Sequence, residues 1–275
     1  MRKQRQKGFT LLELLIVITI IGILAGITII SYPGISQKAK LANAIKFSDN
    51  VRGSLQPDMV AWWKFDETLG TIAKDSWWNE FHGTVVGATW VEGIKGNALS
   101  FDGVNDYVKV DSVVVQNPLA LTIAAWFQKN GNGSNYAKCV LHQSSNASIG
   151  SSSYWMGATS DDYLAATIGA NTGVGWAAGQ TNIKVILEEW NYLVASWNGS
   201  VVKVYVNGKY IKSYPLTTYV SLTTPTRMGA SSDGSNYQFN GLVDDVQIYS
   251  AALPLSMIQQ HYAEGLKTHQ NLAKR

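Results

Sequence analysis

Glu13 is the residue in this sequence whose chemistry is hardest to explain by packing alone. It is the one charged side chain in an otherwise apolar run from Phe9 to Ile30. As a helix this run would be about 33 Å long, which is enough to cross the hydrocarbon core of a bilayer once. A carboxylate inside a membrane segment costs a few kcal/mol unless it has a partner. Glu13 is therefore expected to have a functional role.

Basic residues precede this run, and no acid accompanies them. By the positive-inside rule, Arg2, Lys3, Arg5 and Lys7 should stay cytoplasmic while the rest of the chain is exported. They account for the positive net charge of +3, so basic and acidic residues nearly balance elsewhere and no nucleic-acid partner is expected. The alternative is a cleaved secretory signal peptide. The length of the run, its acid and its lack of an A-x-A-like exit oppose that interpretation.

The residues around Glu13 resemble a known processing motif. The segment KGFTLLEL, residues 7–14, resembles the type IV pilin (class III signal) motif. The resemblance implies that a membrane prepilin peptidase removes leader residues 1–8 by cutting between Gly8 and Phe9, and that Phe9 is then methylated. It also implies that Glu13 assists assembly. A new α-amino group, most simply from a neighbouring pilin subunit, would supply the positive charge that a buried Glu13 needs.

Residues 9–54 are expected to form one long transmembrane and stem helix. Pro33 should kink this helix, and apolar residues at three- and four-residue spacing give the stem beyond the kink a single packing face. The protein should then cross the inner (cytoplasmic) membrane once, with its N-terminus in the cytoplasm. After assembly it would belong to an extracellular pilus or pseudopilus.

The composition of the remaining chain favours a β-rich globular domain. The 275 residues are 46% hydrophobic and 15% charged, with 10 Trp, 13 Tyr and 25 Gly, which excludes a disordered or fibrous protein. The single cysteine, Cys139, excludes an intrachain disulfide and a cysteine-based metal cluster. In the same apolar context, Cys139 and His142 are expected to be buried structural residues.

The pattern of residues 58–264 predicts an all-β sandwich. Strand-like segments occur at 121–127, 192–197 and 201–206, and the last is followed by Asn207-Gly208, a strong hairpin signal. A helix is predicted over 256–264 from a capping-box spacing. Residues 265–275 are polar and basic, and they are predicted to form a flexible tail.

Two blocks of this domain resemble a second family. The segments FDGVNDYV (101–108) and GLVDDVQIY (241–249) resemble the laminin-G-like, concanavalin-A-like lectin/glucanase jelly roll. The implied fold class is mainly β, a concanavalin-A-like jelly-roll sandwich behind the long N-terminal transmembrane or filament-core helix. The sequence SWWNE at 76–80 departs from the family, which usually has a turn rich in serine, glycine and asparagine there.

The same resemblance implies a structural calcium ion held by Asp75, Asn79 and Asp244, since calcium prefers oxygen ligands from a loop and a distant acid. In an extended strand Asp244 would share a face with Leu242, Val246 and Ile248. An acid on an apolar face must be neutralised, hydrogen-bonded or bound to a cation. The alternative stays open that Asp244 only accepts hydrogen bonds from turn amides.

Aromatic residues in a polar region indicate a glycan-binding surface. Residues 130–180 are rich in Gly, Ser and Asn, and Tyr154, Trp155 and Trp176 lie among them. Sugar sites combine an aromatic platform with amide and carboxylate hydrogen bonds. These three residues are therefore predicted ligand-binding residues.

Enzyme chemistry is not expected. The acid pairs Asp161-Asp162 and Glu188-Glu189 are adjacent, so in extended chain their side chains point to opposite sides and cannot form a glycosidase pair by themselves. The motifs of zinc proteases, serine hydrolases and P-loop enzymes do not occur. The sequence predicts a type IV pilin-like filament subunit that displays a lectin-like domain for surface adhesion or glycan binding. The alternatives are a pseudopilin of a type II secretion-like system and a membrane-anchored polysaccharide-processing enzyme.

Overall fold

The computed structural model describes residues 58–131, 137–146, 148–231 and 236–272. The predicted leader and the predicted helix over 9–54 lie outside these residues. Within the described ranges, no helix combines the length and the apolar character that a membrane crossing requires.

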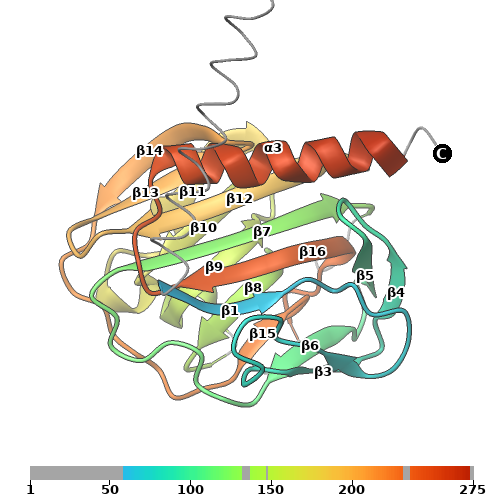
Figure 1. The fold of residues 1–275 in the computed structure, drawn as a ribbon. Coiled ribbons are helices and arrows are strands. Elements are labelled where there is room, and N and C mark those ends of the chain that lie inside the picture. The colour runs from blue at the N-terminus through green and yellow to red at the C-terminus, as the bar shows by residue number, and fades with distance from the viewer. Residues whose placement is uncertain (1–57, 132–136, 147, 232–235, 273–275) are drawn as a thin grey trace, which may run out of the picture. The chain divides into compact units, whose positions relative to one another are not determined.

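Two antiparallel sheets of eight strands each form the domain (Figure 1). Sheet A has the spatial order β14 (Lys209–Pro215), β13 (Val201–Val206), β12 (Trp190–Trp197), β7 (Leu121–Lys129), β16 (Asn240–Tyr249), β5 (Asn97–Asp102) and β4 (Thr89–Glu92), and β1 (Met59–Trp63) also pairs with β16. Sheet B has the order β11 (Gln180–Lys184), β10 (Tyr163–Ile168), β9 (Ser152–Ala158), β8 (Lys138–Ser144), β15 (Thr226–Met228), β6 (Tyr107–Val110), β3 (Gly83–Val86) and β2 (Ile72–Ala73). Three short 3-10 helices are η2 (Ile149–Ser151), η3 (Ala170–Thr172) and η4 (Trp176–Gly179). The predicted all-β sandwich is confirmed.

The hydrophobic core lies between the two sheets. Alternate residues of β7, such as Ile123, Ala125 and Phe127, join it from sheet A, and Tyr154 and Met156 join it from sheet B. Successive side chains of a strand point to opposite faces, so the residues between them lie on the outer faces of the sandwich. Those outer faces carry the polar and aromatic groups that are candidates for function.

The predicted hairpin is confirmed. Strand β13 pairs with β14, and the turn between them is Asn207-Gly208, with φ of 50° and 73°. Both residues have the left-handed conformation that a tight two-residue hairpin requires and that Asn and Gly tolerate best. The turn places the side chains of the two strands opposite each other on the outer face of sheet A.

The C-terminal helix is longer than its pattern indicated. Helix α3 runs from Leu255 to Leu272, so the prediction of a flexible tail from residue 265 is wrong over 265–272. The helix continues past residue 264 because it packs closely on sheet A at Gly265. A Cβ added at this glycine would lie 2.5 Å from the ring of Trp126. The Trp126 ring also stacks on Tyr262, with centroids 5.5 Å apart. The helix is therefore held by packing across the outer face of sheet A (Figure 1).

Candidate functional site

The residues predicted for processing and assembly, Gly8, Phe9 and Glu13, lie outside the described residues. The structure does describe the predicted calcium ligands and the predicted glycan platform. It also describes a pocket that sequence reasoning did not find.

Asp75 holds the loop that follows it. Its carboxylate is buried and accepts hydrogen bonds from backbone N–H groups of residues that come before and after it in the sequence. Oδ1 accepts from Trp62 at 3.1 Å and Trp77 at 2.9 Å, and Oδ2 accepts from Glu80 at 3.3 Å and Phe81 at 3.4 Å. A carboxylate with this many amide donors is already compensated. Asp75 therefore acts as a loop cap, and it offers little to a metal ion.

Asp244 lies on the outer face of sheet A, directly opposite Trp126 on β7. A bulge between Asp244 and Gln247, with Asp245 at a φ of 50°, reverses the alternation of the strand. The prediction that Asp244 shares a face with Val246 and Ile248 is therefore wrong, because those two residues belong to the core between the sheets.

The Asp244 carboxylate is only half satisfied. Its side chain is fully buried, and Oδ2 accepts the Lys95 N–H at 3.0 Å, while Oδ1 has no hydrogen-bond partner among the residues that the structure describes. Burial, with the nearby charges of Asp245 and Asp66, raises the pKa of Asp244 well above its ordinary value. This oxygen could accept a proton or a cation.

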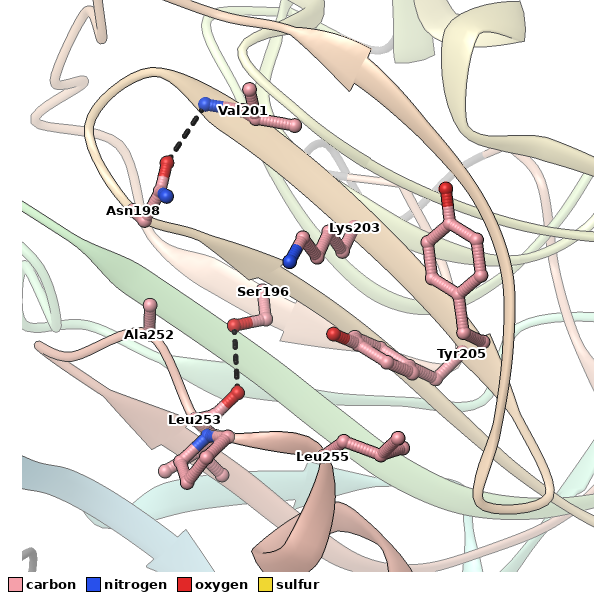
Figure 2. Close-up of a pocket in the computed structure, with 10 residues that line it drawn as sticks. Ser196, Asn198, Val201, Lys203, Tyr205, Ala252, Leu253 and Leu255 are labelled. Atoms are coloured by element: carbon pink, nitrogen blue, oxygen red, sulfur yellow. Dashed lines mark hydrogen bonds between the residues drawn. The ribbon is translucent and has the colours of Figure 1, made fainter.

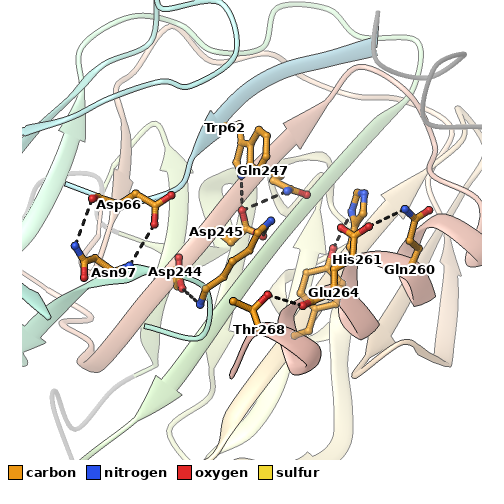
Figure 3. Close-up of polar contacts among 12 residues, drawn as sticks. Trp62, Asp66, Asn97, Asp244, Asp245, Gln247, Gln260, His261, Glu264 and Thr268 are labelled. Carbon is orange, nitrogen blue, oxygen red and sulfur yellow. Dashed lines mark hydrogen bonds and ion pairs between the residues drawn. The ribbon is translucent and has the colours of Figure 1, made fainter. Parts of the chain in front are cut away.

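Asp245, the next residue, is well compensated (Figure 3). It accepts a hydrogen bond from the Trp62 indole, and a second donor, Gln247 Nε2, lies 3.5 Å away. The Lys95 amine is 4.0 Å from its other oxygen. The same amine and that of Lys64 lie 5.3 and 4.2 Å from the centre of the Trp62 ring. Side-chain donors thus compensate the Asp245 carboxylate, whereas Asp244 accepts the backbone N–H of Lys95.

The predicted calcium ligands come from two separate segments of the chain. Asp75 and Asn79 lie in and before the loop that leads to β3, Asp244 lies on β16, and Asn79 is an exposed loop residue with a φ of 62°. Over the residues that the structure describes, no three His, Cys, Asp or Glu side chains form a metal-binding group. Of the three predicted ligands, Asp244 alone offers a buried oxygen without a partner. A calcium ion remains a prediction that rests on this atom.

The predicted aromatic platform is divided between the two faces of sheet B. Tyr154 points into the core, and its hydroxyl lies 2.6 Å from that of Thr226. Trp155, the next residue, packs on the outer face with Cys139 and Ala165, where it is also fully buried. Neither ring offers an exposed surface to a sugar in this structure. Trp176 keeps 36% of its surface exposed and is the one predicted residue that could still do so.

The buried residues of the sequence prediction behave as expected. Cys139 has no exposed surface, and burial raises the pKa of its thiol. His142 is buried with Nε2 2.7 Å from the Ser152 hydroxyl. Both residues belong to the packed sheet and are not reactive groups.

Asp162 forms ion pairs with two lysines. Its Oδ1 lies 2.9 Å from Lys129 Nζ and 3.1 Å from Lys138 Nζ, and both amines are almost fully buried. Partial burial alone would raise the pKa of Asp162, but the hydrogen bonds and charges of the two lysines outweigh it and the pKa is lowered. Such an acid is ionised and already accepts hydrogen bonds from both lysines, so it is poorly suited to donate a proton to a glycosidic oxygen.

A pocket of about 340 Å³ lies on the outer face of sheet A, beside the start of α3 (Figure 2). Lys203, Tyr205 and Tyr210 line it from the β13–β14 hairpin, and Leu255 lines it from the helix. The hairpin and its alternation were readable in the sequence. The position of the start of α3 beside the hairpin, which adds Leu255 to the lining, was not, because it depends on packing between distant segments.

Comparison with known proteins identifies both regions of the chain. Residues 102–259 match the family described as the concanavalin A-like lectin/glucanases superfamily, and residues 3–29 match the prokaryotic N-terminal methylation motif. The first match covers more than half of the sequence. The chain therefore belongs to the concanavalin A-like lectin/glucanases superfamily, and it carries a prepilin-type methylation motif at its N-terminus.

Several relatives are fimbrial proteins. The fimbrial protein EcpC of Eikenella corrodens is 32% identical over 106 residues, which are 38% of this chain and 69% of EcpC. The type IV major pilin protein PilE of Neisseria gonorrhoeae is 34% identical over 73 residues, 26% of this chain and 44% of PilE. The adhesion G-protein coupled receptor V1 of Danio rerio is 31% identical over 107 residues, 37% of this chain, and the chain spans only 2% of that receptor.

Solved structures share the β-sandwich. Domain 4 of AbnA, an arabinanase from Geobacillus stearothermophilus solved with arabinotriose, has a TM-score of 0.56 and 20% identity over 74% of this chain and 97% of that one. A Trypanosoma rangeli sialidase complex has a TM-score of 0.57 and 16% identity over 84% of this chain and 39% of that one. At these identities the likeness shows the fold alone.

Proposed function

We propose that this protein is a type IV pilin-like filament subunit that displays a lectin-like domain for glycan binding and surface adhesion. One observation carries the proposal: a prepilin-type methylation motif and a domain of the concanavalin A-like superfamily occur in the same chain. The similarity to fimbrial proteins supports the filament role.

The N-terminal chemistry follows from the charges of the motif. Before cleavage, the basic residues 2–7 keep the N-terminus in the cytoplasm while the apolar run anchors the chain in the inner membrane. Cleavage by a prepilin peptidase after Gly8 removes these charges and creates an amino group on Phe9. In a filament core, that amine from one subunit compensates Glu13 of a neighbour, which would otherwise be an unpaired buried acid.

Mass spectrometry of the mature protein tests the processing step. The expected mass lacks residues 1–8 and includes one methyl group on Phe9. A protein that retains Met1, or one cut beyond Ile30, would contradict the pilin assignment.

Substitution of Glu13 tests the assembly step. Glu13→Ala should leave membrane insertion intact or improve it, because a costly charge is removed from the apolar segment. It should reduce recovery of the protein in sheared filaments. Thr10→Ala, a change in the same segment that removes no charge, is the matched control and should assemble normally. Normal incorporation of Glu13→Ala would show that the acid has no assembly role.

Electron micrographs of the producing cells test the site of action. Long surface filaments that are labelled by an antibody against residues 58–272 support a pilus subunit. Labelling confined to the cell envelope, with a secretion defect in a deletion strain, would instead indicate a pseudopilin.

A further inference from the structure

The pocket beside α3 combines three features that the filament role does not use. It opens on the outer face of sheet A between β12, the β13–β14 hairpin and the start of the helix (Figure 2). Lys203 is paired across the strands with Ser196 and with Ser213, so these three residues lie in one polar row on this face. A volume of about 340 Å³ is in the range of small-ligand sites.

The pocket has a wall of two tyrosines. Tyr205 and Tyr210 are paired across the hairpin, and their rings meet edge to face with centroids 5.9 Å apart. Tyr210 keeps 51% of its surface exposed, and its hydroxyl donates to the Ser213 hydroxyl at 3.0 Å. An exposed aromatic ring is a surface on which the apolar face of a sugar ring can stack.

Tyr205 differs from its neighbour because only 5% of its surface is exposed while it lines the pocket. Its hydroxyl forms no hydrogen bond with any residue that the structure describes. Burial, with Tyr210 beside it, raises the pKa of Tyr205, so the phenol stays neutral and can donate a hydrogen bond. Its hydroxyl can therefore donate a hydrogen bond to a ligand in the pocket.

Lys203 is the charged residue in the lining of the pocket. Lys203 is exposed, and no carboxylate of the described chain lies within ion-pair distance of its amine. Acidic residues do not occur among the residues lining this pocket, nor in the first turn of α3.

We propose that this pocket binds a sugar residue that bears an anionic group, such as a uronic acid. The sugar ring stacks on the exposed ring of Tyr210, the anionic group faces Lys203, and the Tyr205 hydroxyl donates a hydrogen bond to the sugar. The inference rests on the proposed glycan-binding function and names the class of glycan and its site.

Titration calorimetry on the full chain in detergent micelles tests the pocket. The probes are methyl α-D-galacturonide, the neutral sugar methyl α-D-galactoside, and galactose 6-sulfate, which separates carboxylate recognition from recognition of any anion. The galacturonide should bind at least about tenfold more tightly than the galactoside, because the neutral sugar lacks a charge-assisted hydrogen bond. Tight binding of the sulfate as well would show that charge in general is recognised, which the inference also allows.

Variants of the hairpin assign the binding to this pocket. Lys203→Gln should weaken galacturonide binding by about tenfold, and Lys203→Arg should restore most of it. Tyr210→Ala should weaken both the acidic and the neutral sugar. Lys209→Gln is the matched control, because Lys209 lies on the same hairpin outside the pocket lining. All of these side chains are exposed, so the variants should fold with unchanged melting temperatures.

Two results would overturn the inference. One is equal affinity for the acidic and the neutral sugar. The other is galacturonide binding that neither Lys203→Gln nor Tyr210→Ala changes. A glycan array on the full chain separates this failure from a failure of the proposed function. Binding to neutral glycans alone would refute the pocket assignment and leave glycan binding in place, whereas an array without any bound glycan would refute both.

Discussion

Two Asp-Asp pairs show how differently the same dipeptide can be used in this fold. In both pairs the second aspartate has a left-handed backbone, with a φ of 64° at Asp162 and 50° at Asp245, and in both it collects hydrogen-bond donors. The first aspartate differs. Asp161 is exposed, whereas Asp244 is fully buried, and one of its oxygens has no hydrogen-bond partner in the described part of the chain.

The two pairs differ in how far the charge of the aspartate is compensated by neighbouring groups. Asp162 accepts hydrogen bonds from two lysine amines that are almost fully buried, so its own charge is compensated, and Lys138 also donates to the carbonyl oxygens of Thr159 and Ser160. Asp244 has a backbone amide and further acids near it, so its charge is repelled and not balanced. The Asp162 region is thus complete in the protein alone, and the Asp244 region has room for a proton or a cation.

The largest expected effect on stability comes from removing the ion pairs of Asp162 with Lys129 and Lys138. Asp162→Asn should lower the free energy of unfolding by about 3 kcal/mol or more, because it leaves the buried amines of Lys129 and Lys138 without their carboxylate. Denaturant unfolding of the full chain in detergent measures this. Asp161→Asn, next to it and exposed, should change stability by less than about 0.5 kcal/mol. Equal effects of the two substitutions would contradict the assigned network.

Calcium tests the incomplete region. If Asp244 binds the ion in the folded state only, a hundredfold excess over Kd adds about 2.7 kcal/mol and raises the melting temperature by about 5–10 °C. The measurement compares melting curves of residues 58–275 in millimolar calcium and in chelator. The fragment must keep the whole of α3, which ends at Leu272.

Asp244→Asn is the variant that assigns this effect. It should abolish most of the calcium increment, because a neutral amide is a weaker ligand for a hard cation. In chelator it should be at least as stable as the wild type, since a poorly compensated buried charge is removed. Coincident wild-type curves with and without calcium would reject the metal site.

A smaller effect on stability is expected where α3 packs against Trp126. Gly265→Ala should destabilise the domain by about 1–2 kcal/mol, because the added Cβ would lie 2.5 Å from the ring of Trp126, the cross-strand neighbour of Asp244. Thermal unfolding followed by tryptophan fluorescence measures the change. Ala263→Gly, at an exposed helix position, is the control for helix propensity alone. An unchanged melting temperature for Gly265→Ala would show that the helix does not pack closely there.

The smallest effect is a pH dependence at Asp162. Its pKa in the folded protein is lowered, so its contribution to stability is fully present above the unfolded pKa of about 3.9. That contribution is lost as the pH falls through the lower folded value. The stability difference between the wild type and Asp162→Asn should therefore be constant near neutrality and shrink below about pH 4. A difference that stays constant down to about pH 2 would contradict the lowered pKa.

Local patterns determined much of this protein. Alternation and the Asn207-Gly208 signal predicted the hairpin of β13 and β14, since turn conformation and strand periodicity depend on neighbouring residues. The N-terminal methylation motif over residues 3–29 was recognisable from the sequence, because it is a short linear segment. The buried character of Cys139 and His142 also followed from their apolar context.

Only the tertiary structure decided the positions that depend on distant segments. The bulge at Asp245 turned Asp244 away from Val246, which alternation alone could not show. The length of α3, and with it the end of the predicted tail, depended on packing against Trp126, which lies far earlier in the chain. A helix whose sequence pattern is weak is stabilised mainly by the surface on which it packs. Tyr154 and Trp155 looked equally available in the sequence, yet neighbouring strands bury both rings. Burial and compensation of charge arise from contacts across the fold, so a linear pattern names the candidates and packing selects among them.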